Sequence, residues 1–103
     1  MRVLSFNVDA QRISKNPDCD FTGLVPGSRN YLQARFTFSE EWDGCVLVAS
    51  FWRGKNEHAV LIKDNQCEIP PEVLTGRTFA VSIIGQRGDV IIPTNKVYVR
   101  QEG

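Results

Sequence analysis

Residues 36–51 read FTFSEEWDGCVLVASF, and this stretch decides the fold of the chain. Apolar and polar side chains alternate on both sides of an acidic corner, as they do along a strand with one apolar face. The stretch therefore predicts two β-strands. Between them lies Trp42, followed by Asp43 and Gly44, a pair that turns the chain. We expect the Trp42 ring to cover the open end of the core, and all three residues to define the fold.

The same alternation recurs along the chain. It predicts strands at residues 2–8, 31–38, 45–52, 57–63, 66–69, 78–84, 90–92 and 96–100. Residues 14–28 are rich in turn formers and are predicted to form a long connection, suited to a binding loop. Pro70 ends a strand because proline has no N–H to donate to a sheet. We expect at most one short helical turn, near residues 71–75.

Short strands at regular spacing, with turn signals between them, favour an all-β fold. We predict an antiparallel β-sandwich, immunoglobulin-like or jelly-roll-like, with a small closed β-barrel as the alternative. A chain of 103 residues is one domain, so the sandwich should span residues 1–103. The side chains expected in its core are Leu4, Phe6, Phe36, Phe38, Leu47, Phe51, Leu61, Phe79, Val81 and Val97.

The composition argues against several classes of partner. Twelve Lys and Arg balance twelve Asp and Glu, and the basic residues are scattered, so a nucleic-acid partner is not expected. The longest apolar runs fall far short of the roughly 20 residues that span a bilayer, so membrane insertion is not expected either. The N-terminus lacks the layout of a signal peptide, which favours the cytoplasm.

Residues that carry chemistry are few. His58 is the only histidine, and Cys19, Cys45 and Cys67 form no CxxC pair, so we predict no metal or cofactor site. His58 is the only candidate base, but it lies in a polar hairpin beside Glu57 with no third group to orient it, so no catalytic residue is expected and the protein is predicted not to be an enzyme. Glycine-rich turn chemistry accounts better than ligand recognition for the Arg-Gly-Asp tripeptide at residues 87–89.

Three aromatic residues are predicted on outward faces of strands. Tyr31, Trp52 and Tyr98 are the candidate interaction surface, because exposed rings pack against other subunits or stack on sugars. Pairing of the same rings across neighbouring strands remains an equal alternative. Binding through loops and sheet edges is thus favoured over catalysis.

Several motifs in one order resemble a known group of proteins. They are LVPGSRNYLQARF, FTFSEEWDG, VASF, CEIPPEVL, FAVSIIGQRGD and IIPTNKVYVRQEG, and they cover roughly residues 24–103. The chain resembles small tail- or baseplate-associated β-sandwich structural proteins of phages and prophages of Gram-positive bacteria. The positions that match do so as fold-defining residues: Trp42, Pro70, Glu72, Leu74, Gly85, Thr94 and Asn95.

The resemblance implies a virion structural or interaction module that binds other phage structural proteins, with a homo-oligomer as a further prospect. It implies a location in the virion, or in the host cytoplasm during assembly. The alternative is a small ligand-binding module, either for a glycan of the host surface or as a phage-encoded inhibitor of a host defence protein. No catalytic residue is associated with the pattern.

Overall fold

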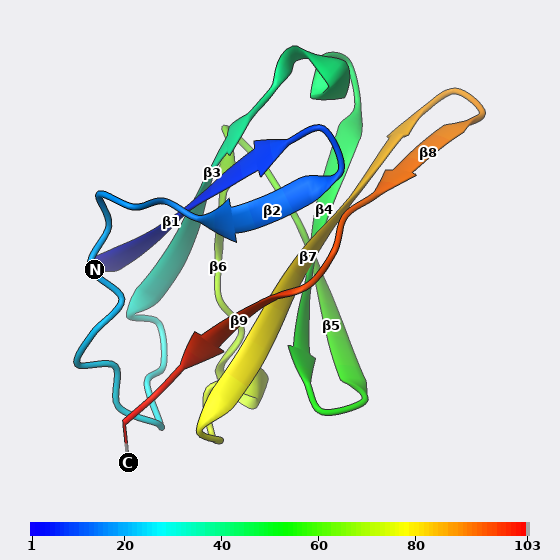
Figure 1. Cartoon of the computed structure of the whole chain (residues 1–103). Helices are drawn as coiled ribbons and strands as arrows, with labels where there is room; N and C mark the ends of the chain where they lie inside the picture. The colour runs from blue at the N-terminus through cyan, green and yellow to red at the C-terminus, as the bar shows by residue number, and fades with distance from the viewer. Residues whose placement is uncertain (103) are drawn as a thin grey trace.

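The structure, a computed structural model, describes residues 1–102 and consists of two β-sheets packed face to face (Figure 1). The sheets enclose one apolar core, and two short 3-10 helices lie at their margins. The elements are β1 (Arg2–Asp9), β2 (Arg12–Lys15), β3 (Leu32–Phe38), η1 (Glu40–Trp42), β4 (Val46–Arg53), β5 (Asn56–Leu61), β6 (Gln66–Glu68), η2 (Pro71–Val73), β7 (Thr78–Arg87), β8 (Val90–Pro93) and β9 (Val97–Arg100).

The first sheet, called sheet A here, has the strand order β2-β1-β3-β6. Strands β1 and β3 are parallel, with Phe6 opposite Phe36, while the other pairings of this sheet are antiparallel. Parallel neighbours need a long return connection. Residues 16–31 provide it, since they bring the chain back from β2 to the start of β3. This physical requirement explains why the turn-rich segment is long.

The second sheet, sheet B, has the order β5-β4-β7-β8 and is antiparallel throughout residues 1–102. The ten-residue strand β7 is shared: its C-terminal half pairs with β8 and its N-terminal half with β9. The β7–β8 hairpin extends beyond the body of the sandwich, at the upper right of Figure 1. Its turn contains Gly88, whose φ of +59° suits the first central position of a tight hairpin.

The predicted all-β sandwich is confirmed, and the fold is not a closed barrel, because the described residues form two separate sheets. Three local predictions differ from the structure. The β1–β3 pair is parallel, although an antiparallel arrangement was predicted. A second helical turn, η1, is present besides the predicted turn η2. Strand β2 was not predicted, and its last two residues overlap the start of the connection predicted at residues 14–28.

Most of the predicted core is buried, but Leu61 is 51 % exposed, so its assignment to the core was wrong. The hairpin register explains the difference. A two-residue turn pairs Arg53 with Asn56, which places Leu61 opposite Val48 on the face that Trp52 shares. That face points away from the core. Phe38, Leu47 and Val97 are half-buried and pack against the core from its margin.

Candidate interaction surface

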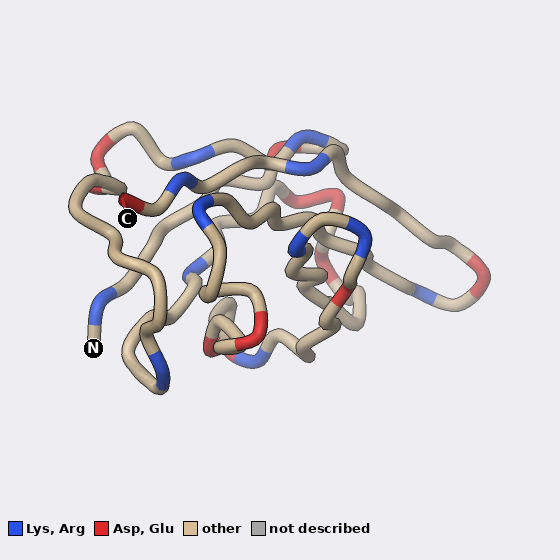
Figure 2. Tube along the Cα trace, turned by 90° about the horizontal axis from the view of Figure 1, so that it is seen from below, with Lys and Arg blue, Asp and Glu red and all other residues tan. Residues whose placement is uncertain are grey.

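The outer faces of the two sheets differ in chemistry. Sheet A carries a largely polar outer face. Strand β1 presents Ser5 and Asn7 on that side, and β3 presents Arg35 and Thr37, while the alternate side chains of both strands fill the core. Such alternation is typical of a sheet with one face in water. Charged residues of both signs are spread along the whole trace, so neither face forms a field of one sign (Figure 2).

Sheet B presents apolar side chains to the outside. Its register aligns Leu61, Val48 and Ile84 in one row across β5, β4 and β7, and the row ends at Pro93 of β8. The next row toward the β7–β8 hairpin holds Val46 on β4 and Ile91 on β8, on either side of Gln86. We call the side chains of Val46, Val48, Leu61, Ile84 and Ile91 the apolar outer face.

Four of these five side chains are open to solvent, and Val48 between them is half-buried. The exposed fraction is 61 % for Val46, 51 % for Leu61, 41 % for Ile84 and 64 % for Ile91. Rows on one face are about 6.8 Å apart and strands about 4.8 Å apart, so two rows over four strands cover on the order of 250 Å². The largest apolar patch of a typical monomer is of similar or somewhat greater size and is often functional, so this face is the candidate contact surface.

Trp52 and Tyr98 lie in one row at the other end of the same face. Ala80 separates them, and together they line a shallow depression of about 300 Å³. The Trp52 indole is not free: its Nε1 donates to Ser82 Oγ at 3.0 Å, and Lys96 Nζ lies 3.8 Å from the ring centroid. Trp52 is accordingly half-buried, whereas Tyr98 is 61 % exposed.

Tyr31 lies apart from the other two aromatic residues. It immediately precedes β3 of sheet A, and its carbonyl oxygen accepts a hydrogen bond of 2.8 Å from the backbone N–H of Arg2. The side chain is 50 % exposed, as predicted for an outward ring. The three predicted interaction residues therefore do not form one surface, since Trp52 and Tyr98 belong to sheet B.

Trp42 joins the two sheets at one end of the sandwich. The ring is 2 % exposed and packs against Phe38 with 5.7 Å between centroids, while Nε1 donates to the carbonyl of Ala10 at 2.9 Å. From sheet B, the backbone of Gly85 meets the ring: a Cβ there would lie 2.8 Å from its Cε3 and Cζ3 atoms. Gly85 is thus required by close approach to Trp42.

The corner after Trp42 is fixed by sheet B. Gly44 has a φ of +77°, a left-handed conformation that glycine adopts without strain. The guanidinium of Arg87 donates from Nη1 to the Asp43 carbonyl at 2.7 Å and to the Glu41 carbonyl at 3.2 Å. Arg87 is therefore used within the fold and is not presented as part of an Arg-Gly-Asp ligand.

Two residues after β8 close the sandwich. Asn95 accepts from the Ile13 N–H at 2.8 Å and donates from Nδ2 to the Ile13 carbonyl at 3.2 Å, so its amide acts as a strand partner for β2. Thr94 Oγ1 accepts from the Ile83 N–H at 2.9 Å. Elsewhere, Pro70 directly precedes η2 with a φ of −64°. Thr94 and Asn95 thus bind backbone groups of β7 and β2.

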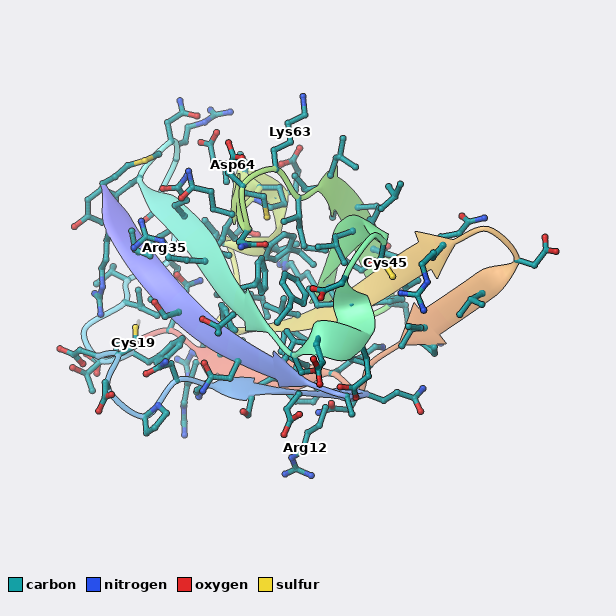
Figure 3. All side chains as sticks on the ribbon, turned by 90° about the horizontal axis from the view of Figure 1, so that it is seen from above. Arg12, Cys19, Arg35, Cys45, Lys63 and Asp64 are labelled. Atoms are coloured by element: carbon teal, nitrogen blue, oxygen red, sulfur yellow. The ribbon has the colours of Figure 1, made fainter. Side chains whose placement is uncertain are left out.

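The three cysteines are free and separate. Cys19 and Cys45 lie far apart in Figure 3, and Cys67 is buried on the inner face of sheet A, where desolvation raises its pKa to about 12. The pKa of Asp20 is lowered by hydrogen bonds from the side chain and backbone of Thr22. Within residues 1–102, no group of three His, Cys, Asp or Glu side chains could hold a metal ion.

The described part of the chain contains no helix of the length and apolarity needed to cross a membrane. Neither a protein family nor a curated protein matches this chain. Its function must therefore be argued from the surface described above. Sequence reasoning singled out Trp52 and Tyr98 but missed the apolar outer face. The runs VLVASFW and FAVSIIG could have indicated it. Nearly continuous apolar stretches of this kind are typical of strands that are covered on both faces.

Proposed function

We propose that the protein is a structural interaction module that binds another protein through the outer face of sheet B. The observation that carries this proposal is the contrast between the two outer faces: the face of sheet A is polar, whereas that of sheet B exposes Val46, Leu61, Ile84 and Ile91. A partner that covered these side chains would remove apolar surface from water, the main favourable term in most protein association.

The extent of the face sets a further condition. The apolar outer face covers on the order of 250 Å² by the strand and row spacings, while a standard interface takes about 800 Å² from each partner. A stable partner therefore also has to contact the surroundings of the face, such as Tyr98 or an edge strand. This requirement suits a protein partner better than a small molecule.

The setting we propose is the tail or baseplate of a phage or prophage, with other virion proteins as partners. The ordered motifs between residues 24 and 103 support this setting. Several motif positions also make specific contacts in the structure, including Trp42 with Gly85 and Asn95 with Ile13. The chain would then act in the virion, or in the host cytoplasm during assembly, by binding and not by catalysis.

Purified phage particles provide the test. In cells that carry this gene and release particles, we expect mass spectrometry to detect the chain in intact particles and in isolated tails. A variant with Val46→Thr, Ile84→Thr and Ile91→Thr should be lost from them, because the apolar contact is removed while the β-branched shape is kept. A matched control, Ser5→Thr with Thr37→Ser on sheet A, should be incorporated normally.

Two results would contradict the proposal in different ways. Particles that never contain the chain would rule out the virion role. Particles that take up the triple threonine variant as well as the parent would show that the apolar outer face is not the contact.

One observation favours a second candidate, glycan binding. The depression between Trp52 and Tyr98 has the aromatic walls on which sugar rings stack. However, Lys96 covers the Trp52 ring, so a sugar would have to displace it. If glycan binding is the activity, Lys96→Ala should strengthen binding to host-surface polysaccharide and Tyr98→Ala should weaken it, both measurable by calorimetry.

A further inference from the structure

The outward side chains of β9 place one aromatic ring between two positive charges. Lys96, just before the strand, Tyr98 and Arg100 are all exposed, whereas Val99 is buried in the core. Side chains on one face of a strand are about 6.8 Å apart. Tyr98 thus has a cation before it and a cation after it, at the end of sheet B away from the apolar outer face.

A small side chain on β7 forms the floor of the depression beside β9. Ala80 lies opposite Trp52 on β4 and opposite Tyr98 on β9, so the two aromatic residues stand on either side of it. Strands β4 and β9 are two strand spacings apart, about 9.6 Å. The depression of about 300 Å³ is at the lower end of the range for small-molecule sites. A space of this size suits a single ring-shaped group, such as one sugar residue.

The Trp52 ring is held in place and faces the depression. Its Nε1 donates to Ser82 Oγ at 3.0 Å, and Lys96 Nζ lies 3.8 Å from the ring centroid. The negative face of the indole attracts a cation at this distance. Since Lys96 belongs to the chain just before β9 and Trp52 belongs to β4, the Lys96 side chain reaches across β7. Any group that enters the depression therefore meets the Lys96 ammonium.

The positive charge at the depression is not balanced by its lining. The lining residues include Lys96 but no acidic side chain. Glu57 is paired with Trp52 from β5, so it lies on the side of Trp52 that faces away from β7 and β9, and its carboxylate accepts from Ser50 Oγ. Glu102 follows two residues after Arg100, farther from Tyr98. The depression is therefore complementary to a ligand that carries a negative charge.

We infer that the depression binds one sugar residue that carries a carboxylate, with the sugar ring between Trp52 and Tyr98 and the carboxylate on Lys96. A neutral sugar would displace the Lys96 ammonium from the indole and offer it no charged partner. An acidic sugar supplies the displaced ammonium with a carboxylate, and hydrogen bonds between charged groups are the stronger ones. The inference rests on the second candidate function, glycan binding, and names the class of glycan.

Single-stranded nucleic acid would use similar groups, because bases stack on aromatic rings while phosphates contact cations. Such binding follows a positively charged groove over several nucleotides. Here the two cations of β9 have Glu57 across the sheet and Glu102 further along the chain, and the depression takes one ring. These features favour an acidic sugar.

NMR spectra of the isotope-labelled full chain test the site, because they resolve the indole N–H groups of its two tryptophans. The probes are methyl glucuronide and methyl glucoside, which differ only in a carboxylate in place of a CH₂OH group. We expect the Trp52 signal to shift in a saturable manner, with about tenfold tighter binding of the glucuronide. The signal of Trp42, which is buried beside Gly85, should not move.

Variants of Lys96 separate the charge from the rings. Lys96→Ala should weaken glucuronide binding about tenfold and strengthen glucoside binding, so that the preference disappears. Lys96→Arg should keep the preference, and Lys63→Ala, which removes an exposed cation elsewhere, is the matched control for net charge. Tyr98→Ala should weaken both sugars. Circular dichroism reports whether each variant is folded, and the preference of the parent chain needs no variant.

Several outcomes would overturn the inference. They are a Trp52 signal that neither sugar moves, equal affinity for the two sugars, and a preference that Lys96→Ala leaves unchanged. Acetate that binds as tightly as the glucuronide would show an anion site without a sugar. Tighter binding of a short oligothymidylate would identify nucleic acid as the ligand instead.

The test is independent of those for the proposed functions. Equal binding of the two sugars would leave glycan binding standing and contradict only the acidic class. The triple threonine variant of the apolar outer face should bind the glucuronide like the parent, because its substitutions lie at the other end of sheet B. Incorporation into particles is measured separately, so the virion proposal stands or fails by its own result.

Discussion

The outer faces of sheets A and B have the same geometry but opposite chemistry. Strands β1 and β3 place apolar residues inside and polar residues outside, as in a sheet with one wet face. Strands β4 and β7 are apolar on both sides over much of their length, which is typical of strands covered on both faces. Within residues 1–102, however, nothing covers the outside of Val46, Ile84 and their neighbours. This difference is the reason for our proposal that another molecule covers the outer face of sheet B.

Both sheets are expected to unfold as one cooperative unit. Removing the Trp42 ring, which contacts both sheets, is the strongest test of that expectation. Trp42→Ala should lower the free energy of unfolding by about 3–5 kcal/mol, the cost of emptying a buried site of this size. Chemical denaturation followed by circular dichroism measures the change. A midpoint equal to that of the parent would mean that the two sheets do not depend on the Trp42 ring.

A smaller loss is expected where sheet B is tied to the edge of sheet A. Asn95→Ala should cost about 1–3 kcal/mol, because it leaves the N–H and C=O of Ile13 without their side-chain partner. The neighbouring exposed change Arg100→Ala serves as the control, since it removes a side chain without that bond. An Asn95 variant no less stable than this control would show that water replaces the amide.

The inner face of sheet A can be probed by pH. Burial raises the pKa of Cys67 from 9.0 to about 12, so the folded state keeps the thiol neutral while the unfolded chain ionises. The contribution of the Cys67 thiol to the free energy of unfolding is complete below pH 9 and is lost as the pH rises toward 12. Between pH 9 and 10 the loss is at most about 1.4 kcal/mol, the equivalent of one pKa unit.

Cys67→Ala supplies the reference for that measurement. The variant is less stable at neutral pH, and the gap between it and the parent should narrow above pH 9. A gap that stays constant from pH 8 to pH 10.5 would argue that the Cys67 thiol is not desolvated in the folded protein.

The smallest effect on stability is expected on the outer faces themselves. Ile84→Thr on sheet B and Thr37→Val on sheet A exchange the chemistry of matched outward positions, and each should change the free energy of unfolding by no more than about 0.5 kcal/mol. Retention on a hydrophobic column should nevertheless fall for Ile84→Thr and rise for Thr37→Val. Equal retention of both variants would remove the contrast between the faces.

The alternation of apolar and polar residues along the sequence was sufficient to predict an all-β sandwich and most of its core. Phe6, Phe36, Phe51 and Phe79 are all buried as the alternation predicts. Leu61 was misassigned because a hydrophobic residue on an alternating strand was taken to face inward, whereas its face follows from the hairpin register set at Gly54-Lys55. Alternation identifies two faces but does not say which one is the core.

The parallel pairing of β1 with β3 could not be predicted by local pattern. Either orientation buries Phe6 and Phe36, and the choice depends on where residues 16–31 lead the chain. That segment is held by contacts distant in sequence, such as the 2.8 Å bond from the Gly27 N–H to the Leu74 carbonyl. The candidate surface was likewise missed in part, because apolar residues in strands are normally assigned to the core and exposure is a property of the assembled sheets.

The β1–β3 pair also has a consequence for the newly made chain on the ribosome. Sheet A can assemble β1, β2 and β3 once Phe38 has emerged, but the central strand β7 of the covering sheet is made later, and 49 residues separate the ends of β3 and β7. At synthesis rates of about 5–20 residues per second, this interval lasts roughly 2–10 seconds. During that time Leu4, Phe6 and Phe36 lack part of the cover that buries them in the finished sandwich, so aggregation of the half-finished chain is a greater hazard than aggregation of the finished one.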